Sequence, residues 1–423
     1  MTDQLSFTDY AGDSIRNEWR ILAIILFCTF AIRFIVILWS PPWLMVYHFD
    51  STRYVMIARN LVEGNGFSAS SESPYLYETY RTPGYPAFLA ACLLVDGDNL
   101  VVARYCQLLF SVLLCYIVFR MAKQVFGPMP GLFAAGVFAC YPFEIYYFSK
   151  ILTEELTTFF LAACVCMLVL SSRSLFDFLA GLLLAIATLV KPSTLLLPVF
   201  LGAGIVLAEG LRARAARRIL FFLVGFAPLL LLLGLSNLHH TGRFYVSPPL
   251  LWGTMLEGLP GEGLNTKELH GKWIVSGGEE LFELEEQLEA VGKNFIKSHP
   301  VVYLRHYAYR LVSNWIGKFN KRFPPFLNGL TVVISFGYLA LAITGIAASW
   351  RRWRRWGILF GVLLFFAAAA AVVKDNARYT IPARPVLIVF AANGLFYCWW
   401  FLRNRMQRKK NGPPGRSRVT DHA

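Results

Sequence analysis

Ten ionisable side chains lie next to long apolar segments of the sequence, and their types suit the handling of a phosphate and a hydroxyl group. A carboxylate can take the proton of a hydroxyl group, and lysine or arginine can bind a phosphate, arginine through two parallel hydrogen bonds. Each alone is more often an interfacial residue, but carboxylates and cations around one opening indicate a binding site. The ten are Asp50, Glu78, Arg81, Lys150, Glu154, Glu155, Lys191, Lys374, Asp375 and Arg378.

A lipid-linked phosphosugar would fit such an opening, because its tail needs hydrocarbon, its phosphate needs cations and its sugar needs a polar cavity. Transfer of the sugar needs a base for the acceptor proton and positive charge for the departing phosphate. We expect Asp50 to be the base. We expect Arg81, Arg378 and Lys191 to bind the phosphate. No metal ion or cofactor is required when these cations cover the leaving group.

Structural interpretations of the same residues stay open. Asp50 could cap the helix that follows it, and Glu154 could be a first-turn acid favoured by the helix dipole. Arg81 and Arg378 could be anchors at a membrane interface, and Lys191 could end its apolar segment.

The elements that must position these side chains are membrane-spanning helices. Of the 423 residues, 56% are hydrophobic and only 16% are charged. Apolar blocks that approach the ~20 residues needed to cross the hydrocarbon must be helical, because in lipid the backbone amides have no other partners. We expect an all-α polytopic membrane protein with about ten such helices. The blocks are 21–39, 101–119, 130–148, 156–170, 175–190, 193–208, 219–236, 327–349, 357–373 and 383–402.

The distribution of lysine and arginine predicts the orientation. Both termini are expected in the cytoplasm, with a cytoplasmic segment 1–20, a transmembrane domain 21–402 and a basic cytoplasmic tail 403–423. The first apolar block lacks a small-residue cleavage site and should remain as an anchor. The net charge of +14 is then a topology signal and argues against a nucleic-acid partner. Of the 40 Lys and Arg residues, 20 lie on the predicted cytoplasmic side, in 1–20, 120–128, 171–174, 209–218, 351–355 and 403–423.

The first long outer loop, 40–100, is expected to contain two short helices. Apolar residues from Tyr54 to Leu61 have helical spacing, and Gly64 should end that helix. A second helix should follow Pro86. Both would lie along the membrane surface.

The second long outer loop, 237–326, differs in character. Its glycine-rich and acidic part, 258–290, predicts a flexible loop. Apolar and aromatic residues at helical spacing from 295 to 315 predict one or two helices after it.

Other polar residues have less specific interpretations. The adjacent His239 and His240 are not expected to bind a metal ion, because two neighbouring histidines need further ligands. Arg33 could extend outward or pair with a buried carboxylate, and the sequence offers no explanation of Glu144. The eight cysteines lie mostly inside apolar blocks and predict neither disulfides nor a metal site.

Six short strings, in order along residues 20–400, carry a resemblance to a known family. They resemble bacterial GT-C glycosyltransferases of family 39, similar to protein O-mannosyltransferases and lipid A aminoarabinose transferases. Each string alone is weakly specific, and the six in register are more so. They are Phe49-Asp50-x-x-Arg53-Tyr54 with Leu61-x-x-Gly64-x-Gly66-Phe67; Tyr80-Arg81-Thr82-Pro83-Gly84-Tyr85-Pro86; Leu152-Thr153-Glu154; Val190-Lys191-Pro192; Gly242-Arg243-Phe244; and Ala377-Arg378-Tyr379-x-x-Pro382-x-x-Pro385.

The resemblance implies a GT-C fold and an inverting transferase that moves a sugar from a polyprenyl phosphate. In such enzymes the aspartate of the first loop, here Asp50, is the catalytic base, and an acid at the position of Glu154 assists. Many relatives have aspartate where Glu154 stands. Arg81 and Arg378 would hold the donor phosphate. Contacts to the acceptor or sugar are expected from Glu78, Glu155, Tyr54 and Tyr85.

The setting implied is the periplasmic face of a bacterial inner membrane, without the soluble outer domain that larger relatives append. The acceptor would be lipid A, a glycolipid, a polysaccharide or a protein. Three other functions stay open: a transporter or flippase of a lipid-linked saccharide, an oligosaccharide ligase with a pyrophosphate donor, and a non-catalytic partner in envelope assembly. A transporter predicts polar residues at mid-membrane depth and paired repeats, which are scarce here.

Overall fold

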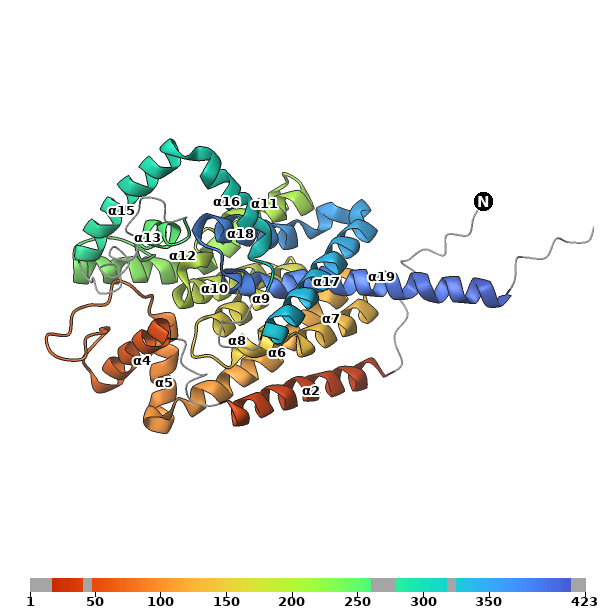
Figure 1. The fold of residues 1–423 in the computed structure, drawn as a ribbon, viewed down its shortest axis with the longest axis horizontal. Helices are drawn as coiled ribbons and strands as arrows, with labels where there is room; N and C mark the ends of the chain where they lie inside the picture. The colour runs from red at the N-terminus through yellow and green to blue at the C-terminus, as the bar shows by residue number, and fades with distance from the viewer. Residues whose placement is uncertain (1–16, 41–47, 260–278, 318–324, 412–423) are drawn as a thin grey trace, which may run out of the picture.

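The computed structural model describes residues 17–40, 48–259, 279–317 and 325–411, and within these ranges the regular elements are helices alone (Figure 1). The long apolar blocks give helices because only intrasegment hydrogen bonds satisfy their amides in lipid. The first half contains α2 (Glu18–Trp39), α4 (His48–Glu63), α5 (Gly84–Asp96), η1 (Gly97–Asn99), α6 (Val101–Phe126), α7 (Pro128–Cys140), α8 (Pro142–Phe148), α9 (Glu154–Leu170), α10 (Ser174–Val190) and η2 (Pro192–Thr194). The second half contains α11 (Leu197–Glu209), α12 (Ala213–Thr241), α13 (Leu251–Leu256), α15 (Glu279–Ser298), α16 (Pro300–Ser313), α17 (Pro325–Ser349), η3 (Trp350–Trp356), α18 (Gly357–Val373), η4 (Ala377–Ala383) and α19 (Arg384–Asn411).

The helices identify a multi-pass membrane protein. Within the described ranges, six helical stretches are long and apolar enough to cross a membrane, or seven if the pair α7 and α8, bent by 59°, is one span. One of the six, Pro325–Val373, contains both α17 and α18 joined by η3. The ten predicted apolar blocks all fall on helices, so the all-helical fold is confirmed, and ten crossings stay a prediction.

Glycines let several helices touch backbone to backbone. A Cβ added at Gly181 of α10 would lie 1.9 Å from the carbonyl oxygen of Phe222 on α12. One added at Gly345 of α17 would lie 2.0 Å from the carbonyl oxygen of Phe390 on α19. Helices in lipid associate through such close packing, because burial from water contributes little between them. These contacts hold α10 against α12 and α17 against α19.

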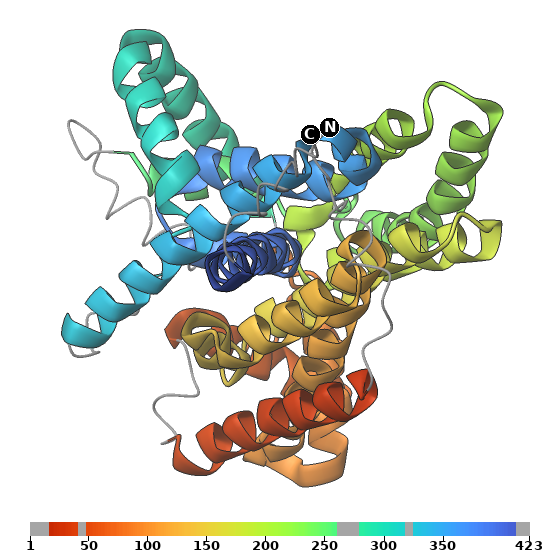
Figure 2. The ribbon, with the colours of Figure 1, turned by 90° about the vertical axis from the view of Figure 1, so that its right-hand side faces the viewer.

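The helix α19 lies near the middle of the bundle, as the view along it shows (Figure 2). Its residues Val386, Phe390 and Asn393 are at most 1% exposed. The Asn393 side chain donates a 2.9 Å hydrogen bond to the carbonyl oxygen of Gly345 on α17. The segment just before α19, η4, is thereby held against the bundle.

The helices of the two outer loops lie at the same end of the bundle, with α4 and α5 on one side of it and α13 and α15 on the other (Figure 1). The two helices predicted for the first outer loop are confirmed as α4 and α5. α4 ends before Gly64, whose φ of +81° is a left-handed conformation that glycine adopts without strain.

The second outer loop corrects one expectation. Residues 279–290, predicted as part of a flexible loop, belong to α15, and the rest of the predicted loop up to 278 lies mostly outside the described residues. Leu281, Leu284 and Leu288 form the buried stripe of α15 and pack with Leu256 and Tyr80. Their spacing of three and four residues is helical, but acidic residues between them obscured the pattern.

Candidate active site

Five charged side chains from five separate segments meet at the end of the bundle that carries the outer-loop helices. Asp50 lies in the first turn of α4, and Arg81 lies in the loop before α5. Glu154 begins α9, Lys191 ends α10 and Arg378 lies in η4. We call this group the outer cluster. The five are the residues predicted as the acid, the base and the phosphate partners.

Local sequence features bring these segments together. The Asn376 side chain accepts a 3.0 Å hydrogen bond from the backbone N–H of Arg378 and so caps η4. At Gly84 an added Cβ would lie 2.6–2.7 Å from backbone atoms of Leu189 and Val190. A glycine at the start of α5 therefore allows the loop that carries Arg81 to approach the end of α10 and Lys191.

Arg378 links the two carboxylates of the outer cluster. Its Nη2 donates to Asp50 Oδ2 at 2.8 Å, and its Nε donates to Glu154 Oε1 at 2.6 Å. These partners lie 328 and 224 residues away in the sequence. One guanidinium thus fixes both candidate acids in the same small space, as its planar fork permits.

Two further cations complete the outer cluster. Arg81 Nη2 pairs with the other oxygen of Asp50, Oδ1, and Lys191 Nζ donates to Glu154 Oε1 at 2.8 Å. The guanidinium of Arg81 lies 4.9 Å from the ring centre of Tyr54 and 4.7 Å from that of Tyr80. Three cations face two carboxylates, so the outer cluster carries one excess positive charge. Such an excess favours an anionic ligand.

Exposure distinguishes the two acids. The Asp50 side chain is 24% exposed, and that of Glu154 is 1% exposed. The Asp50 carboxylate is therefore partly open to solvent, and that of Glu154 is not. Glu154 Oε2 is buried and has no hydrogen-bond partner among the described residues, which leaves one oxygen for a ligand group.

The charge state of Asp50 follows from its neighbours. Burial raises the pKa of its carboxyl group, but Arg378 and Arg81 outweigh burial, and the pKa lies well below its ordinary value. Asp50 is therefore ionised at neutral pH. It is also a weak proton acceptor while both guanidinium groups hold it.

Glu78 lies beside the outer cluster but supports it rather than opening into it. Its side chain is 0% exposed, and it receives hydrogen bonds from Arg53 Nε at 2.8 Å and Arg53 Nη2 at 3.0 Å. It also accepts a 2.5 Å hydrogen bond from the backbone N–H of Tyr80. These contacts order the loop next to Arg81, and a contact from Glu78 to a substrate stays an untested prediction.

The two predicted tyrosines lie beneath the outer cluster. Tyr54 and Tyr85 are 5% and 0% exposed, and their rings meet edge to face at 5.1 Å. Tyr85 donates a 3.0 Å hydrogen bond to Gln107 Oε1. Both support Arg81 and α5, so their expected contacts to a sugar stay predictions.

The other predicted ionisable residues have their own partners. Lys374 pairs with Glu257, and Asp375 Oδ1 accepts a 2.7 Å hydrogen bond from Ser313. Lys150 Nζ lies 4.4 Å from the ring centre of Tyr146. The outer cluster therefore contains only part of the predicted set.

A second charged group lies inside the bundle, and we call it the inner group: Arg33, Glu144 and Arg384. Arg33 is 0% exposed and donates to Ser111 Oγ at 2.6 Å and to the carbonyl oxygen of Ala139 at 3.1 Å. Arg33 therefore points inward, although the sequence allowed an outward position. Glu155, 5% exposed, interacts electrostatically with Arg33 and Glu144.

Arg384 explains Glu144, which had no interpretation from the sequence. Arg384 Nε lies 4.0 Å from Glu144 Oε1, and its Nη1 donates a 2.9 Å hydrogen bond to the Tyr141 hydroxyl group. Sequence analysis missed Arg384 because it begins the apolar block of α19. The signal available was a single cation inside a hydrophobic segment.

The described residues contain no group of three His, Cys, Asp or Glu side chains arranged to hold a metal ion. His240 instead stacks on Tyr77, with ring centres 4.4 Å apart.

Part of the chain matches the model of a known protein family. Residues 80–236 match the family model of dolichyl-phosphate-mannose-protein mannosyltransferases. No match was found among curated proteins. The expected resemblance to this family is confirmed over that part of the chain.

The fold is similar to that of solved membrane enzymes. The archaeal oligosaccharyltransferase AglB from Archaeoglobus fulgidus, in complex with an inhibitory peptide and a dolichol-phosphate, superposes with a TM-score of 0.55 and 14% identity. The apo form of the Archaeoglobus fulgidus oligosaccharyltransferase gives 0.56 and 14%. Each alignment covers 94% of this chain and 52% of the other, so the chain spans about half the length of those enzymes. ArnT from Cupriavidus metallidurans bound to undecaprenyl phosphate gives 0.40 at 14% identity, over 89% of this chain and 76% of that one.

Proposed function

We propose, from the match of residues 80–236 to the mannosyltransferase family and from the outer cluster, that the chain is a polyprenyl-phosphate-dependent glycosyltransferase. It would move one sugar from the lipid carrier to an acceptor, with inversion at the sugar carbon. The acceptor is lipid A, a glycolipid, a polysaccharide or a protein. The supporting observations are the helical GT-C-type fold and the excess positive charge beside an accessible carboxylate.

The observation that carries the proposal is the bridge from Arg378 to both Asp50 and Glu154. It brings Asp50, the proposed base, next to Glu154 and to a cation that would bind the phosphate. Asp50 takes the proton of the acceptor hydroxyl group, and the acceptor oxygen bonds to the sugar carbon. The bond from that carbon to the phosphate oxygen breaks, and its electron pair stays on the phosphate.

The cations have their largest effect on the departing phosphate. The donor is a phosphodiester with one negative charge, and the released phosphate monoester carries about −1.5 to −2. Arg81, Arg378 and Lys191 therefore stabilise the transition state more than the ground state. Among the described residues the excess is one positive charge, which suits a single phosphate better than a pyrophosphate.

The same ion pairs indicate an order of events. While Arg81 and Arg378 hold Asp50, its lowered pKa makes it a poor base. A donor phosphate that takes over these guanidinium groups raises the pKa of Asp50 towards its ordinary value. Donor binding thus prepares the base, and the donor binds before the acceptor reacts.

The proposed orientation places the outer cluster at the periplasmic face of a bacterial inner membrane. The support is the positive-inside distribution of lysine and arginine along the sequence. The transmembrane domain would be 21–402, between the cytoplasmic segments 1–20 and 403–423.

The test is sugar transfer in membrane vesicles that contain the full chain, supplied with radiolabelled polyprenyl-phosphate sugars and total envelope extract as acceptor. We expect Asp50→Asn to lower transfer by ~10²-fold or more at matched expression, because the amide cannot take the proton. Glu63→Gln is the matched control, since Glu63 is exposed at the far end of the same helix.

Two outcomes would decide against the proposal. Wild-type protein that is folded yet transfers none of the sugars would favour a transporter or an oligosaccharide ligase. Transfer that survives Asp50→Asn would retain the enzyme and remove Asp50 as its base.

A further inference from the structure

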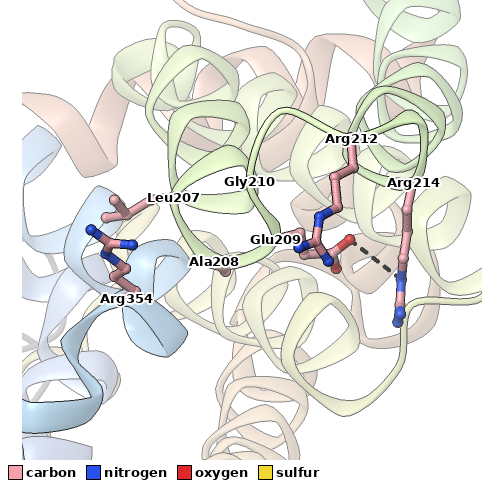
Figure 3. Close-up of a pocket in the computed structure, with 7 residues that line it drawn as sticks. All are labelled: Leu207, Ala208, Glu209, Gly210, Arg212, Arg214 and Arg354. Carbon is pink, nitrogen blue, oxygen red and sulfur yellow. Dashed lines mark ion pairs between the residues drawn. The ribbon is translucent and has the colours of Figure 1, made fainter.

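A cavity of about 450 Å³ opens at the end of α11 that points away from the outer cluster. Arg354 of η3 lies on one side of the end of α11, and Arg212 and Arg214 lie on the other side (Figure 3). Glu209 lies between Arg354 and these two arginines. The lining residues are Leu207, Ala208, Glu209, Gly210, Arg212, Arg214 and Arg354.

This cavity and the outer cluster belong to opposite edges of the bundle. Lys191 precedes η2 and α11, and Glu209 ends α11. Likewise Arg354 precedes α18 and Lys374 follows it. The 17 residues of α18 make a helix about 25 Å long, close to the thickness of the hydrocarbon.

The cavity has positive charge that its own residues do not neutralise. Glu209 Oε1 accepts a 2.7 Å hydrogen bond from Arg218, and its Oε2 lies 3.3 Å from Arg214 Nε. Within the described part of the chain, neither Arg212 nor Arg354 has an acidic partner. Two guanidinium groups therefore remain for an external anion.

Apolar surface adjoins these cations. A neighbouring cavity of about 290 Å³ shares Glu209 and Arg214 with the first and adds Arg355. Its lining also includes Val125, Leu168 and Leu359. Leu211, beside Arg212, is 93% exposed. Cations next to lipid-compatible surface suit an anion that carries a hydrocarbon tail.

We propose that this cavity binds the phosphodiester headgroup of an anionic phospholipid in the leaflet opposite the outer cluster. Arg212 and Arg354 hold the phosphate oxygens, and the acyl chains lie along the adjoining apolar surface. Arginine suits this role because its guanidinium binds phosphate oxygens in pairs.

A lipid held there would connect the turn between α11 and α12 to η3. The helices next to these two segments, α11 and α18, are already in contact, since a Cβ added at Gly204 would lie 2.5 Å from the Gly357 carbonyl oxygen. A bound lipid would therefore stabilise the folded bundle without touching the outer cluster.

The test is thermal unfolding of the full chain purified in detergent, followed by tryptophan fluorescence, with added phosphatidylglycerol, phosphatidylcholine or inorganic phosphate. We expect phosphatidylglycerol to raise Tm in a saturable manner and the other two to raise it little at equal concentration. In Arg212→Gln/Arg354→Gln the half-saturating concentration of phosphatidylglycerol should rise about 30-fold. Each arginine is expected to contribute ~1 kcal/mol to lipid binding, and the double variant loses both contributions.

The matched control is Arg217→Gln/Arg352→Gln, which removes the same charge from α12 and η3 outside the cavity lining. It should keep the wild-type response, and Arg212→Lys/Arg354→Lys should keep part of it. Equal loss in the control would mean general attraction to a basic surface and overturn the site. Equal stabilisation by inorganic phosphate would overturn the lipid as its ligand, and an unchanged response of the first variant would overturn both.

Discussion

The outer cluster and the inner group each place arginine beside a carboxylate, but their access to solvent differs. In the outer cluster Asp50 is 24% exposed, whereas Arg33, Glu144 and Arg384 are at most 3% exposed. An accessible pair can exchange a partner for a substrate ion. A buried pair has no such competitor, and its charges must stay together. Access therefore separates Asp50, which would serve catalysis, from the inner group, which holds the fold.

The largest effect is expected from a variant that breaks the inner group and lowers the stability of the protein. Arg384→Leu should destabilise the protein by roughly 3–5 kcal/mol, because it leaves Glu144 buried without its charge partner. Unfolding of the purified protein by chemical denaturant would measure this. Glu144→Leu/Arg384→Leu should recover most of the loss, since it removes both charges. A double variant as unstable as the single one would show that the pairing of these two residues is not what Arg384 contributes.

A somewhat smaller effect, on sugar transfer, is expected from a variant that breaks the outer cluster. Arg378→Gln should lower sugar transfer by about 10²–10³-fold, because loss of one hydrogen-bond donor to a developing oxyanion costs about that much. Its stability should change less than that of Arg384→Leu, because Asp50 keeps Arg81 and Glu154 keeps Lys191. Activity and denaturant unfolding measured on the same preparation separate the two effects. If Arg378→Gln lost stability but kept its transfer activity, Arg378 would serve the fold and not the departing phosphate.

The smallest effect concerns pH. In the free protein the pKa of Asp50 is lowered, so the acid limb of kcat/KM should lie well below pH 4. With donor bound, the phosphate draws Arg81 and Arg378 away, and the acid limb of kcat should lie at higher pH. Transfer rates over a range of donor concentrations and pH values would measure both limbs. Coincident limbs would contradict the exchange of partners.

The stability contribution of Asp50 has a defined sign. Since its folded pKa is lowered, ionised Asp50 contributes stability above its unfolded pKa of about 3.9, and the contribution is lost as pH falls through the folded pKa. The difference between wild type and Asp50→Asn should therefore be constant from about pH 8 to about pH 5.

Much of this arrangement could be predicted from the sequence, because local pattern determines it. The apolar blocks predicted the helices, and Gly64 marked the end of α4. The strings around Asp50, Arg81 and Arg378 indicated which polar residues belong together. The helices and their ends depend on residues near one another in the chain, whereas the grouping of the three strings came from their shared resemblance to one family.

What could not be predicted depends on contacts between distant residues. Arg384 and Glu144 are 240 positions apart, and nothing in either segment indicates the other. The sequence suggests Glu78 as a substrate contact, but in the structure Arg53 donates hydrogen bonds to both of its carboxylate oxygens. The leucines of α15 are separated by glutamates, and the surface that buries them comes from Leu256 and Tyr80.

The bend between α7 and α8 has a consequence for Arg33. Pro142 has no N–H, so the carbonyl oxygen of Phe138 loses the hydrogen bond that a continuous helix would supply. Arg33 Nη2 lies 3.4 Å from that oxygen, and Nη1 donates to the next carbonyl at 3.1 Å. An arginine from another helix thus serves as the missing backbone donor. The proline and the arginine are more than 100 residues apart. Each alone would leave polar groups without partners in a membrane, and here the donors of the arginine satisfy the carbonyl oxygen that the proline leaves unbonded.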